Sequence, residues 1–216
     1  MNLDLFDHAA PSADPEPIGR QSVILRGFAL PEVPRLLEAL ARLEAEAPFR
    51  HMTTPGGHTM SVALTNCGGW GWVSDGRGYR YTRRDPATDR PWPAMPDVFA
   101  SLAARAAMAA GFGDFLPDAC LVNRYLPGSR LALHQDRNER DFSAPIVSVS
   151  LGIPAVFLFG GAARADRAKR HPLFHGDVAV WGGEDRLRYH GILPLRDAHH
   201  PDLGAQRINF TLRKAG

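Results

Sequence analysis

Two stretches in the first half of the chain repeat apolar residues at the spacing of an amphipathic helix. In residues 31–45, leucine and valine recur every three or four positions, and a proline occupies the first turn. A second helix is expected over residues 97–110. Gly111 should end it, because glycine commonly follows the last turn of a helix. The pattern therefore predicts two helices that each bury one face.

The second half of the chain consists of short apolar or alternating runs, which are typical of β-strands. Glycine and proline turn signals separate the runs. Many short strands in close succession favour a sandwich or barrel over alternating strands and helices. We predict a mainly β domain with flanking helices. The expected strands are residues 22–28, 119–126, 130–134, 145–151, 155–159, 177–181, 187–192 and 207–213.

Residues 66–93, called the lid below, differ from both halves in composition. Glycines alternate there with Trp70, Trp72, Tyr79 and Tyr81, and within residues 77–90 five arginines accompany two aspartates. Such a segment makes a poor core, so we expect it to cover a binding site.

Composition indicates one globular domain. The chain has 216 residues, 44% of them hydrophobic and 22% charged, which excludes bulk disorder. The acidic start of the chain does not resemble a secretory signal, so a cytoplasmic location is expected. No run is long and apolar enough for a membrane span. We expect residues 1–20 to be a flexible tail and residues 21–216 a single domain, with its β core over residues 119–214.

The net charge is only +2, so the pull on nucleic acid as a whole is modest. Locally, residues 77–90 and 164–170 each carry a cationic excess that suits contact with phosphates. Cys67 and Cys120 match no metal or redox spacing and are expected in the core.

The strongest local signal for chemistry is the sequence His134-Gln135-Asp136. Side chains alternate along a strand, so positions 134 and 136 point to the same side. Together with one more histidine, they fit the two-histidine, one-carboxylate site of non-haem iron oxygenases. His190 precedes a glycine after a β-type run and is a good third ligand. The other histidines of this half are His171, His175, His199 and His200, of which the last two lie in a polar loop.

The last expected strand, residues 207–213, alternates apolar with polar residues. Its polar face carries Arg207 and Arg213, and the strand at 119–126 offers Asn123 and Tyr125. If both polar faces line the inside of a barrel, they form a pocket for a small dicarboxylate, because the guanidinium group binds carboxylates through two parallel hydrogen bonds.

Several segments taken together resemble the AlkB family of Fe(II)- and 2-oxoglutarate-dependent dioxygenases, from about residue 20 to the end. They include TPGGHTMSVALTNCG, PDACLVNRYLPGSRLALHQD and RINFTLR. The resemblance implies a double-stranded β-helix, or jelly roll, with the lid as a nucleotide-recognition element. It also implies Fe(II) as the metal, with 2-oxoglutarate and O2 as co-substrates. The implied iron ligands are His134, Asp136 and His190. The implied 2-oxoglutarate residues are Asn123, Tyr125, Arg207, Asn209 and Arg213.

The activity implied by this resemblance is oxidative demethylation of alkylated bases such as 1-methyladenine and 3-methylcytosine, releasing formaldehyde, succinate and CO2. The substrate would be single-stranded or base-flipped DNA, with RNA left open, and the protein would act as a monomer. Trp72 would stack on the base, and the hydroxyls of Tyr79 and Tyr81 would reach phosphate or sugar. Arg164 would form the opposite wall.

Two positions depart from the bacterial family pattern. Asn138 stands where the family has a second aspartate, which predicts weaker discrimination between charged and neutral lesions, unless Glu139 supplies the missing charge. Arg188 stands in place of an aromatic residue. Two alternatives to the implied activity are an oxygenase of the same fold that hydroxylates a protein or small molecule, and a non-catalytic module that binds damaged DNA.

Overall fold

The computed structural model describes residues 14–216, so the expected tail lies outside the described residues up to residue 13. Within residues 14–20, strand β1 (Glu16–Pro17) pairs antiparallel with β2 (Ser22–Leu25). Ile18 is buried and packs in a hydrophobic cluster. The ordered fold therefore begins before residue 21.

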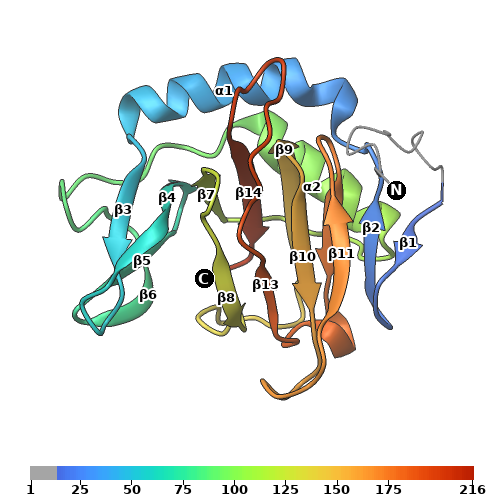
Figure 1. The fold of residues 1–216 in the computed structure, drawn as a ribbon. Coiled ribbons are helices and arrows are strands. Elements are labelled where there is room, and N and C mark those ends of the chain that lie inside the picture. The colour runs from blue at the N-terminus through green and yellow to red at the C-terminus, as the bar shows by residue number, and fades with distance from the viewer. Residues whose placement is uncertain (1–13) are drawn as a thin grey trace.

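Two antiparallel sheets form the body of the protein (Figure 1). The larger has eight strands in the order β1, β2, β12 (Val178–Trp181), β9 (Ile146–Gly152), β14 (Arg207–Arg213), β7 (Ala119–Tyr125), β4 (Thr59–Gly68) and β3 (Arg50–Thr53). The smaller has the order β11 (Lys169–Leu173), β10 (Ala155–Phe159), β13 (His190–Ile192) and β8 (Leu131–His134). This architecture is the expected jelly roll.

Two helices cover the outer face of the larger sheet (Figure 1). They are α1 (Val33–Glu46), which follows the short 3-10 turn η1 (Leu30–Glu32), and α2 (Asp97–Ala109). Their apolar faces share one core with the sheet. Phe99 of α2, for example, lies with its ring centroid 4.7 Å from that of Phe210 in β14. Gly111 has a φ of +85°, which glycine adopts readily, and it ends the helix as predicted.

Alternation along β14 determines what each face of the sheet carries. Its apolar residues, Ile208, Phe210 and Leu212, pack in the core that the helices share. Its polar residues point to the other side and line a cavity that also takes residues from the smaller sheet. β14 pairs along its whole length with β7 and over six residues with β9, so the polar face is held in a central part of the sheet.

The lid contains a two-stranded ribbon, β5 (Gly71–Asp75) and β6 (Gly78–Thr82), which pairs with neither larger sheet. The predicted strands of the second half are present with small shifts at their ends. The sequence patterns did not predict the strands β1, β3, β4, β5, β6 and β11, nor the 3-10 turn η2 (Gly183–Asp185). β11 begins with charged residues and lacks apolar alternation, so its sequence resembles a continuation of the basic stretch 164–170. Within residues 14–216, no helix is long and apolar enough to cross a membrane.

Candidate metal centre and cofactor pocket

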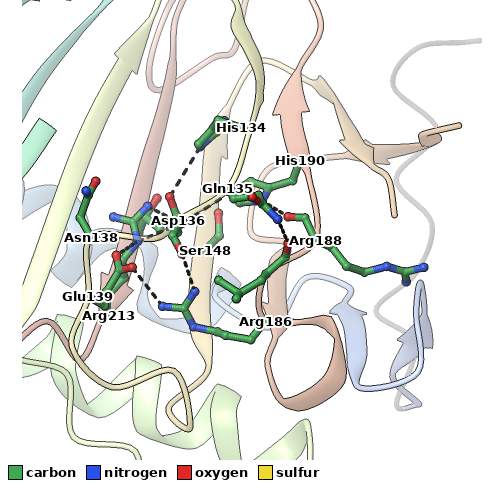
Figure 2. A network of polar contacts seen from close by, with 12 residues as sticks. His134, Gln135, Asp136, Asn138, Glu139, Ser148, Arg186, Arg188, His190 and Arg213 are labelled. Carbon is green, nitrogen blue, oxygen red and sulfur yellow. Dashed lines mark hydrogen bonds and ion pairs between the residues drawn. The ribbon is translucent and has the colours of Figure 1, made fainter. Parts of the chain in front are cut away.

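Three side chains converge at one end of the smaller sheet. His134 ends β8 and His190 begins β13, and the two residues are cross-strand partners. Asp136 follows two residues after His134, and its carboxylate oxygens lie 3.6 Å from Nε2 of each imidazole. All three ligand atoms lie within 4.8 Å of one another. The predicted trio is therefore brought together on one side of a common point, as Figure 2 shows.

Backbone contacts fix the orientation of both imidazoles. Nδ1 of His134 lies 2.9 Å from the carbonyl oxygen of Ala132, and Nδ1 of His190 lies 2.9 Å from that of Arg188. Because a carbonyl only accepts hydrogen bonds, each Nδ1 carries the proton and each Nε2 presents a lone pair. Burial, with a smaller contribution from His134, lowers the pKa of His190, which favours the neutral form that binds metals.

Asp136 is held as a carboxylate by the cations around it. Burial alone would raise its pKa, but the Arg213 guanidinium and, to a smaller extent, the two neighbouring imidazoles hold it well below the ordinary value. Arg213 donates to Oδ2 of Asp136 from both Nε (3.0 Å) and Nη2 (2.8 Å). Two neutral imidazoles and one carboxylate form a donor set that suits Fe(II).

A buried ion-pair network behind Asp136 was not found from the sequence. Glu139 and Arg186 are both buried, and their side chains approach to 3.3 Å. Arg186 also donates to the backbone carbonyl of Asp136 (3.0 Å), and Arg213 lies 3.4 Å from Glu139 (Figure 2). Nothing local marks these residues, because the two partners are 47 positions apart in sequence. Glu139 is thus buried and ion-paired with Arg186 and Arg213, whereas the suggestion that it supplies the charge missing at Asn138 requires its carboxylate to face the substrate.

A cavity of about 620 Å³ opens between the two sheets beside the trio. Its walls include all five residues that the resemblance assigns to 2-oxoglutarate: Asn123, Tyr125, Arg207, Asn209 and Arg213. The polar faces of β7 and β14 therefore do line the inside of the barrel, as the alternation predicts.

Arg207 has donors without partners. Its Nη2 donates to Oγ of Ser150 at 2.8 Å and its guanidinium lies over the Tyr125 ring, but Nε and Nη1 are buried and make no hydrogen bond. Nη1 of Arg213 is likewise buried without a partner. Burying the N–H donors of a cation without hydrogen-bond partners destabilises the fold, unless an anion accepts hydrogen bonds from them. The free donor of Arg213 lies beside the trio, and the free donors of Arg207 lie further along β14. Together they fit a molecule with two carboxylates.

The amides of this cavity differ in how far the protein already satisfies them. Asn209 donates to Oγ of Ser148 (2.8 Å) and to the carbonyl of Val149 (2.9 Å), and it accepts from Thr211 (3.0 Å). Asn123 has one long contact, 3.5 Å, with Asn209. Asn209 is thus held rigidly, while Asn123 keeps capacity for a further partner.

Aromatic side chains stand at the mouth of the cavity. Trp72 and Tyr79 stack with ring centroids 5.5 Å apart and an angle of 14° between their planes. Both line the cavity, together with Asn138 and Arg164. The indole N–H of Trp72 donates to Oδ1 of Asn138 (3.2 Å), and Nδ2 of Asn138 donates to the carbonyl of Tyr79 (3.4 Å). Asn138 therefore joins the lid to the segment that follows the metal ligands.

Tyr81 has a different environment from the one expected of it. Its hydroxyl donates to Oε1 of Glu139 at 2.7 Å, and Tyr81 is not among the residues that line the cavity. Burial raises the pKa of its hydroxyl well above the ordinary value. The contact with Glu139 joins the lid ribbon to the ion-pair network, and this does not fit the expectation that the Tyr81 hydroxyl reaches phosphate or sugar.

Three of the other histidines and both cysteines lie outside the trio. His171 lines a separate cavity, and the rings of His175 and His200 stack on each other 4.1 Å apart. Cys67 and Cys120 are buried, unoxidised and opposite each other on β4 and β7, as expected of core residues.

A jelly roll with two histidines and one carboxylate beside an arginine-lined cavity defines an Fe(II)- and 2-oxoglutarate-dependent oxygenase. The chain belongs to the 2OG-Fe(II) oxygenase superfamily, whose family model matches residues 21–213. It is 55% identical over 213 residues to the alpha-ketoglutarate-dependent dioxygenase AlkB of Salmonella typhimurium, covering 99% of this chain and 98% of the relative. The AlkB of Escherichia coli K12 is also 55% identical, over 214 residues.

The fold agrees with this relationship. The solved structure of OsALKBH1 superimposes with a TM-score of 0.82 at 26% identity, covering 93% of this chain and 99% of that one. The protein is thus a dioxygenase that uses Fe(II), 2-oxoglutarate and O2.

Proposed function

We propose that this dioxygenase removes methyl groups oxidatively from nitrogen atoms of nucleic-acid bases, with 1-methyladenine and 3-methylcytosine as substrates. The observation that carries the proposal is the stacked pair Trp72 and Tyr79 at the mouth of the cavity that holds the His134 trio. Flat aromatic side chains beside a cation suit a nucleobase and its phosphate. The relatives at 55% identity, both named AlkB, agree with this assignment.

The position of the methyl group determines whether the substrate base can be paired. A methyl group on the pairing edge of a base is inaccessible within a duplex, so the base must be single-stranded or flipped out. In the proposed complex, Trp72 stacks on the extruded base, the Asn138 side chain faces its polar edge, and Arg164 contacts the backbone from the opposite wall. These contacts involve the base and the backbone, which DNA and RNA both have, so they are compatible with either substrate.

We assign Fe(II) to His134, Asp136 and His190, on the side that faces the cavity. Arg207, with Tyr125 and Asn209, would hold the far carboxylate of 2-oxoglutarate, and its two unpaired donors support this role. Arg213 and Asn123 would hold the carboxylate nearer the metal.

Iron with 2-oxoglutarate and O2 supplies the oxidation that turns the N-methyl group into a hydroxymethyl group, with succinate and CO2 as co-products. The hydroxymethyl group then leaves as formaldehyde and restores the base. The protein residues position the methyl group and exclude water. Stacking by Trp72 contributes about 1–3 kcal/mol to holding the base.

The decisive experiment uses a single-stranded oligonucleotide with one 1-methyladenine, incubated with the protein, Fe(II), 2-oxoglutarate and air. Mass spectrometry should show loss of the methyl group in the complete mixture and no loss with His134→Ala. If iron and 2-oxoglutarate bind but the methyl group stays, the substrate is a protein or small molecule instead. If the oligonucleotide binds without any turnover of 2-oxoglutarate, the chain is a binding module for damaged DNA.

We also propose that the protein acts as a monomer in the cytoplasm, where a nucleic-acid substrate would be found. Among residues 14–216, the most exposed large apolar side chains are Met108 and Leu116, which lie in α2 and in the loop that follows it and do not line the cavity. Light scattering after size-exclusion chromatography should give a mass near 23.6 kDa, that of a single chain.

A further inference from the structure

A second cavity, of about 550 Å³, lies between the hairpin that joins β10 to β11 and the segment that joins β1 to β2. None of its lining residues also lines the cavity of the metal centre. The hairpin side of this second cavity contains part of the basic stretch 164–170, for which the proposed function gives only Arg164 a role.

Cations predominate in the walls of the second cavity: Arg20, Arg167, Lys169 and Arg188. Arg20 pairs with Glu184 at 2.6 Å, and Arg188 pairs with Asp185 at 3.1 Å. Arg167 and Lys169 have no ion-pair partner among residues 14–216.

The lining contains a single carboxylate, that of Asp166, and it is hydrogen-bonded to the backbone. It accepts a hydrogen bond from the N–H of Ala163 at 2.9 Å, within its own turn. Asp166 keeps its negative charge, so Arg167 and Lys169 leave the walls of the cavity with a net excess of one positive charge, which favours an anionic occupant.

Two further groups in the walls suit an oxyanion. The Arg188 guanidinium lies over the Phe159 ring, 5.2 Å from its centroid, so the ring supports one face of the planar group. Figure 2 shows Arg188 extending away from Asp136, although it lies only two residues before His190. Nε2 of His171 is buried and has no hydrogen-bond partner, which leaves a polar atom available to an occupant.

The hairpin connects this cavity to the metal centre. Arg164 lines the first cavity, and Arg167, three residues later in the same turn, lines the second. A strand whose base occupies the first cavity would therefore have neighbouring phosphates near this turn.

We propose that the second cavity binds a backbone phosphate of the nucleic-acid strand whose damaged base enters the first. This inference rests on the proposed function. Arg167 and Lys169 would supply the charge, and Arg188 the planar donor group that matches phosphate oxygens. The arrangement would select substrates long enough to reach both cavities.

The test measures the affinity for an unmodified single-stranded 15-mer at several salt concentrations. Each phosphate contact on a single strand contributes about 0.7 to the slope of log K against log salt. Because the proposed cavity holds one phosphate, Arg167→Ala/Lys169→Ala should lower the slope by about 0.7, with several-fold weaker binding at low salt. The matched control, Arg35→Ala/Arg42→Ala, removes the same charge from exposed positions on α1 and should leave the slope unchanged. An equal change in both variants would show a general charge effect and overturn the proposal.

Two further experiments distinguish strand binding at the second cavity from the demethylation reaction and from the binding of a free anion. The nucleoside 1-methyladenosine has no phosphate to place in the second cavity, so both double variants should demethylate it like the unmodified protein. If inorganic phosphate binding is lost in Arg167→Ala/Lys169→Ala while the 15-mer slope stays the same, the cavity takes free phosphate and the proposal fails. If the slope falls but no oligonucleotide is demethylated, the cavity assignment stands and the proposed reaction fails.

Discussion

Arg213 and Asp136 form a buried ion pair, with Nη2 of the arginine 2.8 Å from Oδ2 of the aspartate. The arginine ends β14 in the larger sheet, whereas the aspartate follows β8 in the smaller one. This contact therefore joins the two sheets at the metal centre. Burial alone would lower the pKa of Arg213, but Asp136, Tyr81 and Glu139 raise it above the ordinary value, so the guanidinium stays charged.

Replacing Arg213 with methionine should destabilise the iron-free protein strongly. The change leaves the carboxylates of Asp136 and Glu139 without their shared cation, and breaking a buried pair typically costs about 3–5 kcal/mol. Urea unfolding monitored by tryptophan fluorescence measures the free energy of unfolding. Arg42→Met, which breaks an exposed pair on α1, should cost less than about 1 kcal/mol. Similar losses in both variants would contradict the assigned role of Arg213.

Replacing Arg207 with lysine should weaken 2-oxoglutarate binding while the metal is still bound. The ammonium group cannot reproduce the two free guanidinium donors, and losing about 1.5–3 kcal/mol corresponds to about 10- to 100-fold in Kd. Calorimetry without oxygen, with Mn(II) in place of Fe(II), measures this affinity directly. Ser150→Ala removes only the contact that Arg207 makes with a protein hydroxyl and should change Kd by a few-fold. Unchanged binding by the lysine variant would place the carboxylate elsewhere.

Replacing Asn138 with aspartate should increase the preference for cationic lesions. A carboxylate opposite a positively charged base should raise kcat/KM for 1-methyladenine, relative to neutral 1-methylguanine, by about tenfold. The same change removes the amide that donates to the carbonyl of Tyr79, so the lid contact weakens as well. Asn138→Ala, which loses that donor without adding charge, separates the two effects. An unchanged ratio in Asn138→Asp would show that the position does not determine lesion charge preference.

The lid should lose stability in acid because of Asp85. Arg50 donates to both oxygens of its carboxylate. Burial raises the pKa of Asp85, but Arg50 and backbone donors outweigh this effect and lower it below the ordinary value. A group with a lowered pKa stabilises the folded state above its unfolded pKa of about 3.9 and loses that contribution as the pH falls further.

The variant Asp85→Asn tests this titration. Its unfolding free energy should be about 2 kcal/mol lower than that of the unmodified protein from pH 5 to 7. The difference should shrink below about pH 4. A difference that stays constant down to pH 3 would show that the Arg50 contact does not depend on the charge of Asp85.

Periodicity allowed much of the structure to be predicted. Alternation in residues 207–213 correctly separated the core face of β14 from the face that lines the cavity, because side-chain direction in a strand follows from position alone. The same rule placed His134 and Asp136 on one side. The choice of His190 among five histidines needed the family resemblance as well, since several of them lie in the same half of the chain.

Periodicity could not predict how deeply a side chain is buried, or which residues distant in sequence come into contact. Tyr79 and Tyr81 lie on the same face of β6, yet one is half exposed at the cavity mouth and the other donates to a buried carboxylate. Likewise, the walls of the second cavity come from residues 20, 167 and 188, which belong to three segments that are far apart in sequence. Such contacts depend on tertiary structure and leave no periodic signal.

The position of His134 has a consequence for protein lifetime. β8 is an edge strand of the smaller sheet, and its pairing with β13 consists of His134 with His190 and Leu131 with Ile192, with an irregularity between them. A bound ion would therefore cross-link this edge, whereas the iron-free protein holds it by few hydrogen bonds. Proteases should cleave near residues 131–136 first when iron is scarce, so that turnover of the enzyme would follow the supply of its metal.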